Sequence, residues 1–308
     1  MPASVICFLV MLGNVPSRQA GPSQQKGVEQ EFARGVELLQ EGKLDLAEQT
    51  FLLVIKASPQ SPDPYFFLGK VYLARKDPRA AGTLLKCVEL DPTRDDAWEE
   101  LSRELARRRA FDRAIRIFQH YAEISPQKTL AHLLLGEAYF NGTHYTKAIE
   151  QFQKATELNS HSARAYYSLG QVNETTGRAE EAIGDFQRSL ALNPTSALAN
   201  YHLGDLFIAE GNYRQAVQSL NQAIQLSPDN PDFYFSLGQA YFLEKSYSEA
   251  ISQLQQAVRL RPDYAQAHYL LGRCYTAQSK PELARAEYTL SRKVRKKEAE
   301  PKKAIAAP

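Results

Sequence analysis

Cysteine is scarce in this chain of 308 residues, which contains three. Cys7, Cys87 and Cys274 lie far apart in the sequence and share no spacing typical of metal ligands. We therefore predict no cysteine metal site, and we expect Cys87 and Cys274 to be small buried apolar residues.

The sequence also lacks the constellations that carry out catalysis. No nucleophile stands beside a base, and no glycine-rich phosphate loop is present. The six histidines are scattered without metal-ligand spacing: His120, His132, His144, His161, His202 and His268. We expect no catalytic residue, no metal, no cofactor and no small-molecule substrate, so the protein is not predicted to be an enzyme.

Charge of one sign is not in excess either. The formal net charge is +2, so no global electric field draws in nucleic acid. Apolar residues make up 44% of the chain and charged residues 23%, both ordinary for a folded soluble protein. A local cluster of arginines between residues 103 and 116 is the one candidate nucleic-acid site, although nearby Glu99, Glu100, Glu104 and Asp112 favour a solvated, balanced turn.

Long apolar runs are missing, and the run from Val5 to Leu12 is too short for a membrane-spanning helix of about 20 residues. Its length fits the core of a signal peptide, but no Lys or Arg precedes it and Arg18-Gln19-Ala20 is a poor cleavage site. We interpret residues 1–26 as a leader with a flexible linker at 21–25. Export to the periplasm or outside is favoured, and a cytoplasmic protein with a disordered leader or a misassigned start is the alternative.

What the sequence does contain is a repeated phrase. Five glycines, Gly136, Gly170, Gly204, Gly238 and Gly272, are each separated by 34 residues. Each is followed by apolar residues at helical spacing, a turn, a second helical stretch and, in most copies, a proline. A fixed period of this length indicates stacked pairs of helices without one central core. Cys87 and Cys274 lie several repeats apart, so a disulfide between them is not expected.

Helical periodicity begins at residue 28 and continues to about residue 296. The predicted units are 28–61, 62–94, 95–128, 129–162, 163–196, 197–230, 231–264 and 265–296, followed by a disordered tail at 297–308. The step from Gly69 to Ser102 is one residue short, and we place the missing residue in the turn at Lys76-Asp77-Pro78, where a deletion is tolerated best.

Small residues recur where the two helices of a unit must approach closely. They are glycine at the eighth position and alanine at the twentieth: Gly35, Gly69, Gly136, Gly170, Gly204, Gly238, Gly272, Ala47, Ala114, Ala148, Ala182, Ala216, Ala250 and Ala284. Leucine at the seventh position and an aromatic residue at the eleventh and twenty-fourth are predicted to fill the space beside them. A Gly204→Leu change should therefore clash, at a cost of about 1–3 kcal/mol or more.

This combination of positions over residues 28–296 resembles the tetratricopeptide repeat family. Departures are local: Arg34 replaces leucine in the first unit, Ser102 replaces glycine in the third, and Asn173 replaces an aromatic in the fifth. The resemblance implies an all-α solenoid, a right-handed superhelix of stacked helix-turn-helix repeats. It also implies that the first helix of each unit lines a concave groove that binds a protein or peptide.

The family's groove positions, carried over onto this sequence, predict an apolar row. Its members are Phe32, Phe66, Leu133, Tyr167, Tyr201, Phe235 and Tyr269 at the fifth positions, interrupted at Glu99 and widened by Phe140 and Phe242. Either this row binds a partner, or its side chains pack on their neighbours as scaffold. Lys70, Arg103 and Arg107 are candidates for receiving a partner's carboxylate.

Two specialised ligand classes known in the family are not supported. The Lys and Asn clamp for a peptide's terminal carboxylate is missing from the ninth positions, and the asparagine ladder of sugar-transferase members is missing from the sixth. We therefore predict a non-catalytic adaptor that binds a protein or peptide. The alternative is an accessory subunit of an envelope or polysaccharide export complex.

Overall fold

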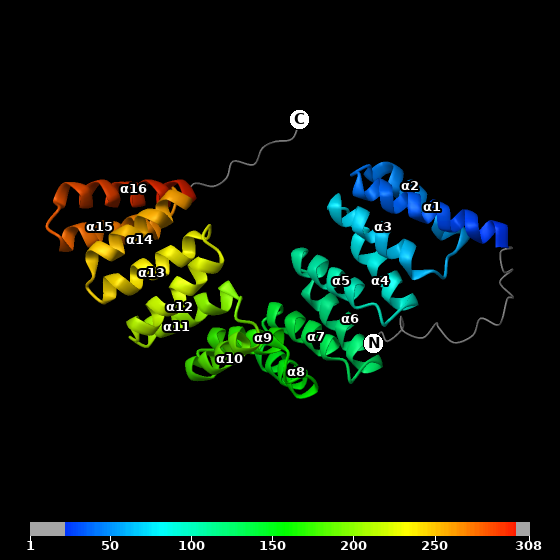
Figure 1. Ribbon diagram of the computed structural model, residues 1–308, viewed down its shortest axis with the longest axis horizontal. Coiled ribbons are helices and arrows are strands. Elements are labelled where there is room, and N and C mark those ends of the chain that lie inside the picture. The colour runs from blue at the N-terminus through cyan, green and yellow to red at the C-terminus, as the bar shows by residue number, and fades with distance from the viewer. Residues whose placement is uncertain (1–21, 300–308) are drawn as a thin grey trace, which may run out of the picture. The chain divides into compact units, whose positions relative to one another are not determined.

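The structure, a computed structural model, describes residues 22–299 (Figure 1). These residues form sixteen α-helices, and no strand occurs among them. The apolar run of the predicted signal peptide lies outside the described residues, as does most of the predicted tail. The chain divides into two compact units at Ala110 and Phe111. The division falls inside the third predicted repeat, the one in which Ser102 replaces the glycine of the eighth position.

The first unit contains α1 (Pro22–Gln40), α2 (Leu44–Ala57), α3 (Pro62–Ala74), α4 (Ala80–Leu90) and α5 (Asp95–Arg107). Helix α1 begins at Pro22, inside the segment expected to be a linker. Proline is well tolerated in the first turn of a helix, and the glutamines, lysine and glutamates that follow are good helix formers. Arg34 is largely exposed on this terminal helix, with 65% of its side chain accessible, so a polar residue is tolerated there.

The second unit contains α6 (Phe111–Ile124), α7 (Thr129–Asn141), α8 (Tyr145–Leu158), α9 (Ala163–Thr175), α10 (Ala179–Leu192), α11 (Ala197–Ala209), α12 (Tyr213–Leu226), α13 (Pro231–Leu243), α14 (Tyr247–Leu260), α15 (Ala265–Ala277) and α16 (Pro281–Ala299). Helix α16 continues two residues beyond 297, where the disordered tail was expected to begin. Lysine and glutamate both favour helix, so the charged end of α16 has no residue that would terminate it earlier.

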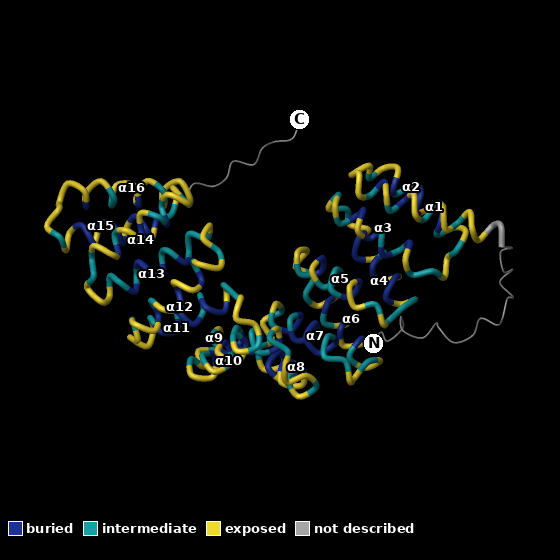
Figure 2. Tube along the Cα trace, viewed as in Figure 1, coloured by how far each residue is buried: buried dark blue, intermediate teal, exposed yellow. Residues whose placement is uncertain are grey.

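Within each unit, every helix packs against the next one along the chain. The first helices of neighbouring repeats also touch each other, as seen for α1 with α3, α7 with α9, α11 with α13 and α13 with α15. The buried positions follow the faces between helices, while the turns are exposed (Figure 2). This arrangement is an all-α solenoid.

The first helix of every repeat ends in the same way. The fifteenth residue of the unit adopts a left-handed conformation in all eight turns: Gly42, Lys76, Arg109, Thr143, Gly177, Gly211, Lys245 and Ser279. Its N–H donates to the carbonyl three residues back, and the next N–H donates to the carbonyl five residues back, as in Lys245 to Phe242 and Ser246 to Tyr241. This is the Schellman motif, which satisfies the carbonyls left open at the end of a helix.

The eighth-position glycines make room for a side chain of the second helix. A Cβ added to Gly204 would lie 2.5 Å from Cγ of Leu220, and one added to Gly136 would lie 2.5 Å from Cε1 of Phe152. The side chain met is therefore the twenty-fourth residue, while the twentieth contributes backbone, as Ala250 O lies 3.3 Å from the added Cβ of Gly238. In the second repeat the partner of Gly69 is Leu84, one residue closer in sequence, which confirms a deletion in the intervening turn.

Both described cysteines are fully buried and free of disulfides, as predicted. Burial raises the pKa of the thiols of Cys87 and Cys274 to about 11. Because the thiolate is the reactive form, these residues serve packing.

Candidate protein-binding surface

The predicted apolar row lies on the first helices, but most of its members are partly covered. Phe66 and Leu133 are buried, Tyr269 is exposed at 46%, and the other members are half-buried. Phe140 and Phe242, which were expected to widen the row, are also half-buried. The row is therefore only partly accessible and does not form a continuous exposed apolar strip.

In the first unit, the aromatic residues of the row pack on their neighbours. The ring of Phe32 lies 5.4 Å from that of Phe67 and 6.0 Å from that of Phe51, between ring centroids. Phe66 carries the guanidinium of Arg94 at 4.1 Å from its centroid and the ammonium of Lys70 at 5.6 Å. Here the scaffold interpretation of the row describes the contacts better.

The cations predicted to receive a partner's carboxylate already contact groups of this chain. Arg107 donates two hydrogen bonds of 2.8 Å to Glu104, which also accepts from Arg108 and is 1% exposed. Burial raises the pKa of Glu104, but the two guanidinium groups outweigh it and hold the pKa below its ordinary value. Arg103 lies 2.9 Å from Glu100. The arginine cluster is thus largely balanced in this unit.

In the second unit, two tyrosines of the row frame a histidine from the sixth position of the next repeat. His202 stacks on Phe186 with centroids 5.1 Å apart and planes 4° apart. Its ring lies 5.9 Å from that of Tyr167 and 5.4 Å from that of Tyr201. Tyr201 also packs on Phe233, at 5.1 Å. Tyr167 and Tyr201 are both half-buried.

Two carboxylates lie beside these rings. Glu174 Oε2 is 2.9 Å from His202 Nδ1. Burial raises the pKa of Asp205, hydrogen bonds with Ser236 and Tyr201 lower it in part, and the negative charge of Glu174 raises it again. We call Tyr167, Gln171, Glu174, Tyr201, His202 and Asp205 the central surface. Gln171 Nε2 donates to Tyr167 Oη at 3.2 Å, which fixes the first of the two rings.

Towards the end of the second unit, the charges on the row are again paired. Arg261 donates to both carboxylate oxygens of Asp232, at 2.9 and 3.0 Å, and Tyr264 Oη donates at 2.7 Å. Phe235 packs on Tyr264 with centroids 5.0 Å apart. The exposed ring of Tyr269 lies 5.6 Å from the guanidinium of Arg295 on α16.

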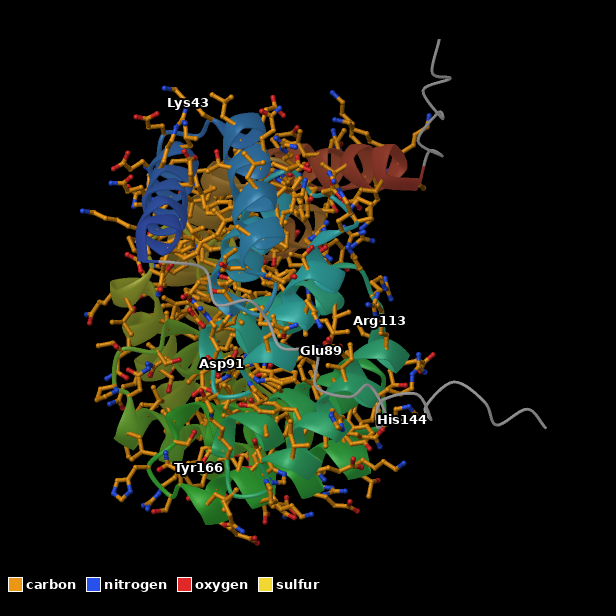
Figure 3. All side chains as sticks on the ribbon, turned by 90° about the vertical axis from the view of Figure 1, so that its right-hand side faces the viewer. Lys43, Glu89, Asp91, Arg113, His144 and Tyr166 are labelled. Atoms are coloured by element: carbon orange, nitrogen blue, oxygen red, sulfur yellow. The ribbon has the colours of Figure 1, made fainter. Side chains whose placement is uncertain are left out.

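Sequence reasoning placed Tyr167 and Tyr201 in this surface but did not select Glu174 and His202 as site residues. Glu174 occupies the twelfth position of its repeat, a groove position in the family, so its place in the repeat could have identified it. His202 occupies the sixth position, which follows the groove residue Tyr201. Charged side chains on other faces, such as Lys43 and Arg113, project from the ribbon (Figure 3). Position in the repeat thus separates the central surface from the many solvated charges.

Residues 22–299 contain neither a metal-binding cluster nor a membrane-spanning helix. No group of three or more His, Cys, Asp or Glu side chains in this range is arranged to hold a metal ion. No helix in the described part of the chain has both the length and the apolar character needed to cross a bilayer.

A solenoid of helix pairs with an accessible first-helix face defines the class of repeat proteins that present a binding surface. Residues 204–245 and 241–279 match a model described as TPR repeat. Residues 133–197 and 175–222 match two models described as tetratricopeptide repeat. These matches show that the chain contains tetratricopeptide repeats from residue 133 to residue 279.

Solved structures share the fold at low sequence identity. The crystal structure of MamA is 22% identical with a TM-score of 0.52, covering 54% of this chain and 96% of MamA. That of YrrB, described as a TPR protein with an unusual peptide-binding site, is also 22% identical, with a TM-score of 0.53 and coverage of 58% and 92%. The crystal structure of the APC/C hetero-tetramer Cut9-Hcn1 has a TM-score of 0.62 at 22% identity. The match covers 80% of this chain and 48% of that one. No curated protein sequence matches the chain.

Proposed function

We propose that this protein is a non-catalytic adaptor that binds a protein or peptide on the first-helix face of its second unit. The observation that carries the proposal is the central surface, where the half-buried Tyr167 and Tyr201 lie beside two carboxylates. Tyrosine is enriched in protein interfaces because it combines a large apolar ring with a hydroxyl that forms hydrogen bonds. Membership of a repeat family whose stacked helices form extended binding faces supports the same conclusion.

The members of the predicted row have two different roles in this proposal. Phe66 and Leu133 are buried, and the ring of Phe32 packs on those of Phe51 and Phe67, so we assign all three to the scaffold. Tyr167, Tyr201, Phe235 and Tyr269 remain the candidates for contact with a partner.

A capture experiment tests the proposal. The bait is the full chain, either unchanged or carrying Tyr167→Ala/Tyr201→Ala/Phe235→Ala. The matched control is Tyr166→Ala/Tyr213→Ala/Tyr234→Ala, which removes three equally half-buried tyrosines away from the fifth positions. Proteins captured by the unchanged chain and the control, but not by the first variant, are the expected result. Thermal unfolding followed by circular dichroism shows that both variants are folded.

Equal capture by all three baits would contradict the proposal, because the row would then be scaffold throughout. Turnover of a substrate by the purified chain would contradict the non-catalytic part of it.

A further inference from the structure

The central surface differs from the rest of the described first-helix face because its carboxylates do not lie against arginine. Elsewhere in the second unit, carboxylates on this face lie against arginine: Glu137 is 2.8 Å from Arg164, and Asp232 is 2.9 Å from Arg261. Among the described residues, neither Glu174 nor Asp205 has a lysine or arginine partner. His202 is the basic side chain that both of them face.

The rings follow the same division. On the first helices, Phe66 lies under Lys70 and Arg94, Phe242 lies under Arg273, and Tyr269 lies under Arg295. In the described part of the chain, no cation lies over Tyr167 or Tyr201. At these other positions on this face, a lysine or arginine of the protein covers the aromatic ring. In the described part of the chain, the rings of the central surface lack such a cation.

We infer that the central surface binds an extended peptide segment through an arginine or lysine side chain, whose cation lies beside Glu174 and Asp205 and against the rings of Tyr167 and Tyr201. This inference rests on the proposed adaptor function and names the chemistry of its partner. Arginine fits best, because its planar guanidinium can stack on a tyrosine ring while donating hydrogen bonds to a carboxylate.

The electrostatics of the surface favour a cation over other partners. Burial disfavours ionisation of Asp205, and repulsion from the negative charge of Glu174 disfavours it further. A guanidinium or ammonium group between them relieves that repulsion, whereas a phosphate or a terminal carboxylate would add to it. The surface therefore selects against nucleic acid and acidic peptides.

Fluorescence anisotropy with synthetic peptides tests this inference on the full chain. The probe is a fluorescein-labelled Gly/Ser peptide of about twelve residues with arginine at every third position, and the comparison peptides carry glutamate or glutamine there. The charge variant is Glu174→Gln/Asp205→Asn, which keeps the shape of both side chains. The matched control is Glu150→Gln/Glu157→Gln, which removes the same charge from exposed positions on α8.

We expect the arginine peptide to bind the unchanged chain and the control equally, and the charge variant about tenfold or more weakly, a loss of about 1.4 kcal/mol. The glutamate peptide should not bind. Binding should weaken as salt is raised from about 0.05 to 0.5 M, because part of the surface is open to solvent. Thermal unfolding of all three proteins establishes that each is folded.

Equal affinity of the arginine peptide for the charge variant and the unchanged chain would overturn the inference, as would preferential binding of the glutamate peptide. A concentration-dependent dimer that dissociates in the charge variant would assign the surface to the basic stretch 292–297 of a second copy, and would also overturn it. Capture of the same proteins by the charge variant, combined with their loss from the tyrosine variant, would leave the adaptor function standing and remove only the basic partner.

Discussion

The two units of the molecule use one helix-pair design but treat charge differently. In the first unit, carboxylates and guanidinium groups are matched, as in Glu48, which accepts hydrogen bonds from Arg75, Arg79 and Tyr72 at 2.5, 2.8 and 3.0 Å. In the middle of the second unit, Glu174 and Asp205 face a histidine and two tyrosine rings instead. The comparison teaches that the residues defining the fold and those defining the surface vary independently from repeat to repeat.

The largest expected effect comes from the packing that both units share. Gly204→Leu places a side chain where Leu220 already lies, and Leu220 is fully buried, so we expect a loss of about 3 kcal/mol in the stability of the second unit. Gly69→Leu should do the same in the first unit, against Leu84. Hydrogen exchange read by mass spectrometry assigns the loss to a unit.

Gly184→Ala is the control for these packing changes. It lies within α10, and a Cβ added there meets nothing within 4 Å. Alanine favours helix over glycine, so this variant should gain about 0.5–1 kcal/mol. A stable Gly204→Leu protein with unchanged exchange would contradict the packing described above.

The next largest effect is expected when the charge pairing of the first unit is broken. Glu104→Gln leaves Arg107 and Arg108 without their carboxylate, and because both guanidinium groups are partly exposed we expect about 2 kcal/mol of destabilisation at pH 7. The pKa of Glu104 is lowered by folding, so its contribution is present above the unfolded value of 4.5 and is lost as pH falls through the folded one. Urea unfolding at pH 7 and pH 3 measures the difference, and Glu89→Gln, an exposed acid, serves as the control.

A smaller effect should be equal in the two units. Lys76 and Lys245 adopt φ of 57° and 67° in corresponding turns, a conformation that disfavours side chains with a Cβ. Lys76→Gly and Lys245→Gly should each raise the stability of their unit by about 0.5–1 kcal/mol, measured by thermal unfolding. Destabilisation by either variant would show that the lysine side chain contributes more than its backbone strain costs.

The smallest effect has the opposite sign to that of Glu104→Gln and concerns the central surface. Burial and Glu174 raise the pKa of Asp205, so the ionised form is disfavoured by folding. Its cost is fully present above the folded pKa and disappears as pH falls below the unfolded value of 3.8. Asp205→Asn should therefore raise the unfolding midpoint at pH 7 but not at pH 3. A lowered midpoint at pH 7 would contradict this account of the site.

The repeat, its turns and its glycine contacts were predictable from the sequence because each depends on residues at fixed spacing. Each eighth-position glycine, such as Gly204, meets the side chain sixteen residues later in the sequence. The exception is the second repeat, where the distance is fifteen residues. Exposure of the row was not predictable in the same way. Tyr201 packs on Phe233 of the next repeat, and Phe235 packs on Tyr264 at the end of its own repeat, at positions that are not aromatic in every copy.

The charges show the same limit. Arg107 and Glu104 are three residues apart, a spacing that brings side chains together on a helix, so their pairing could have been anticipated. The link between Glu174 on α9 and His202 on α11 crosses from one repeat to the next, so it depends on how neighbouring repeats pack.

The neighbour-to-neighbour packing of the helices also has a consequence for how the chain reaches its native state. The helix pairs that pack extensively are adjacent, or separated by one helix, along the chain within each unit. Closing such short loops costs little entropy, so any hairpin can nucleate and growth can proceed from it in either direction. Such a chain can begin to fold on the ribosome as soon as two helices have emerged, before most of its sequence has been translated.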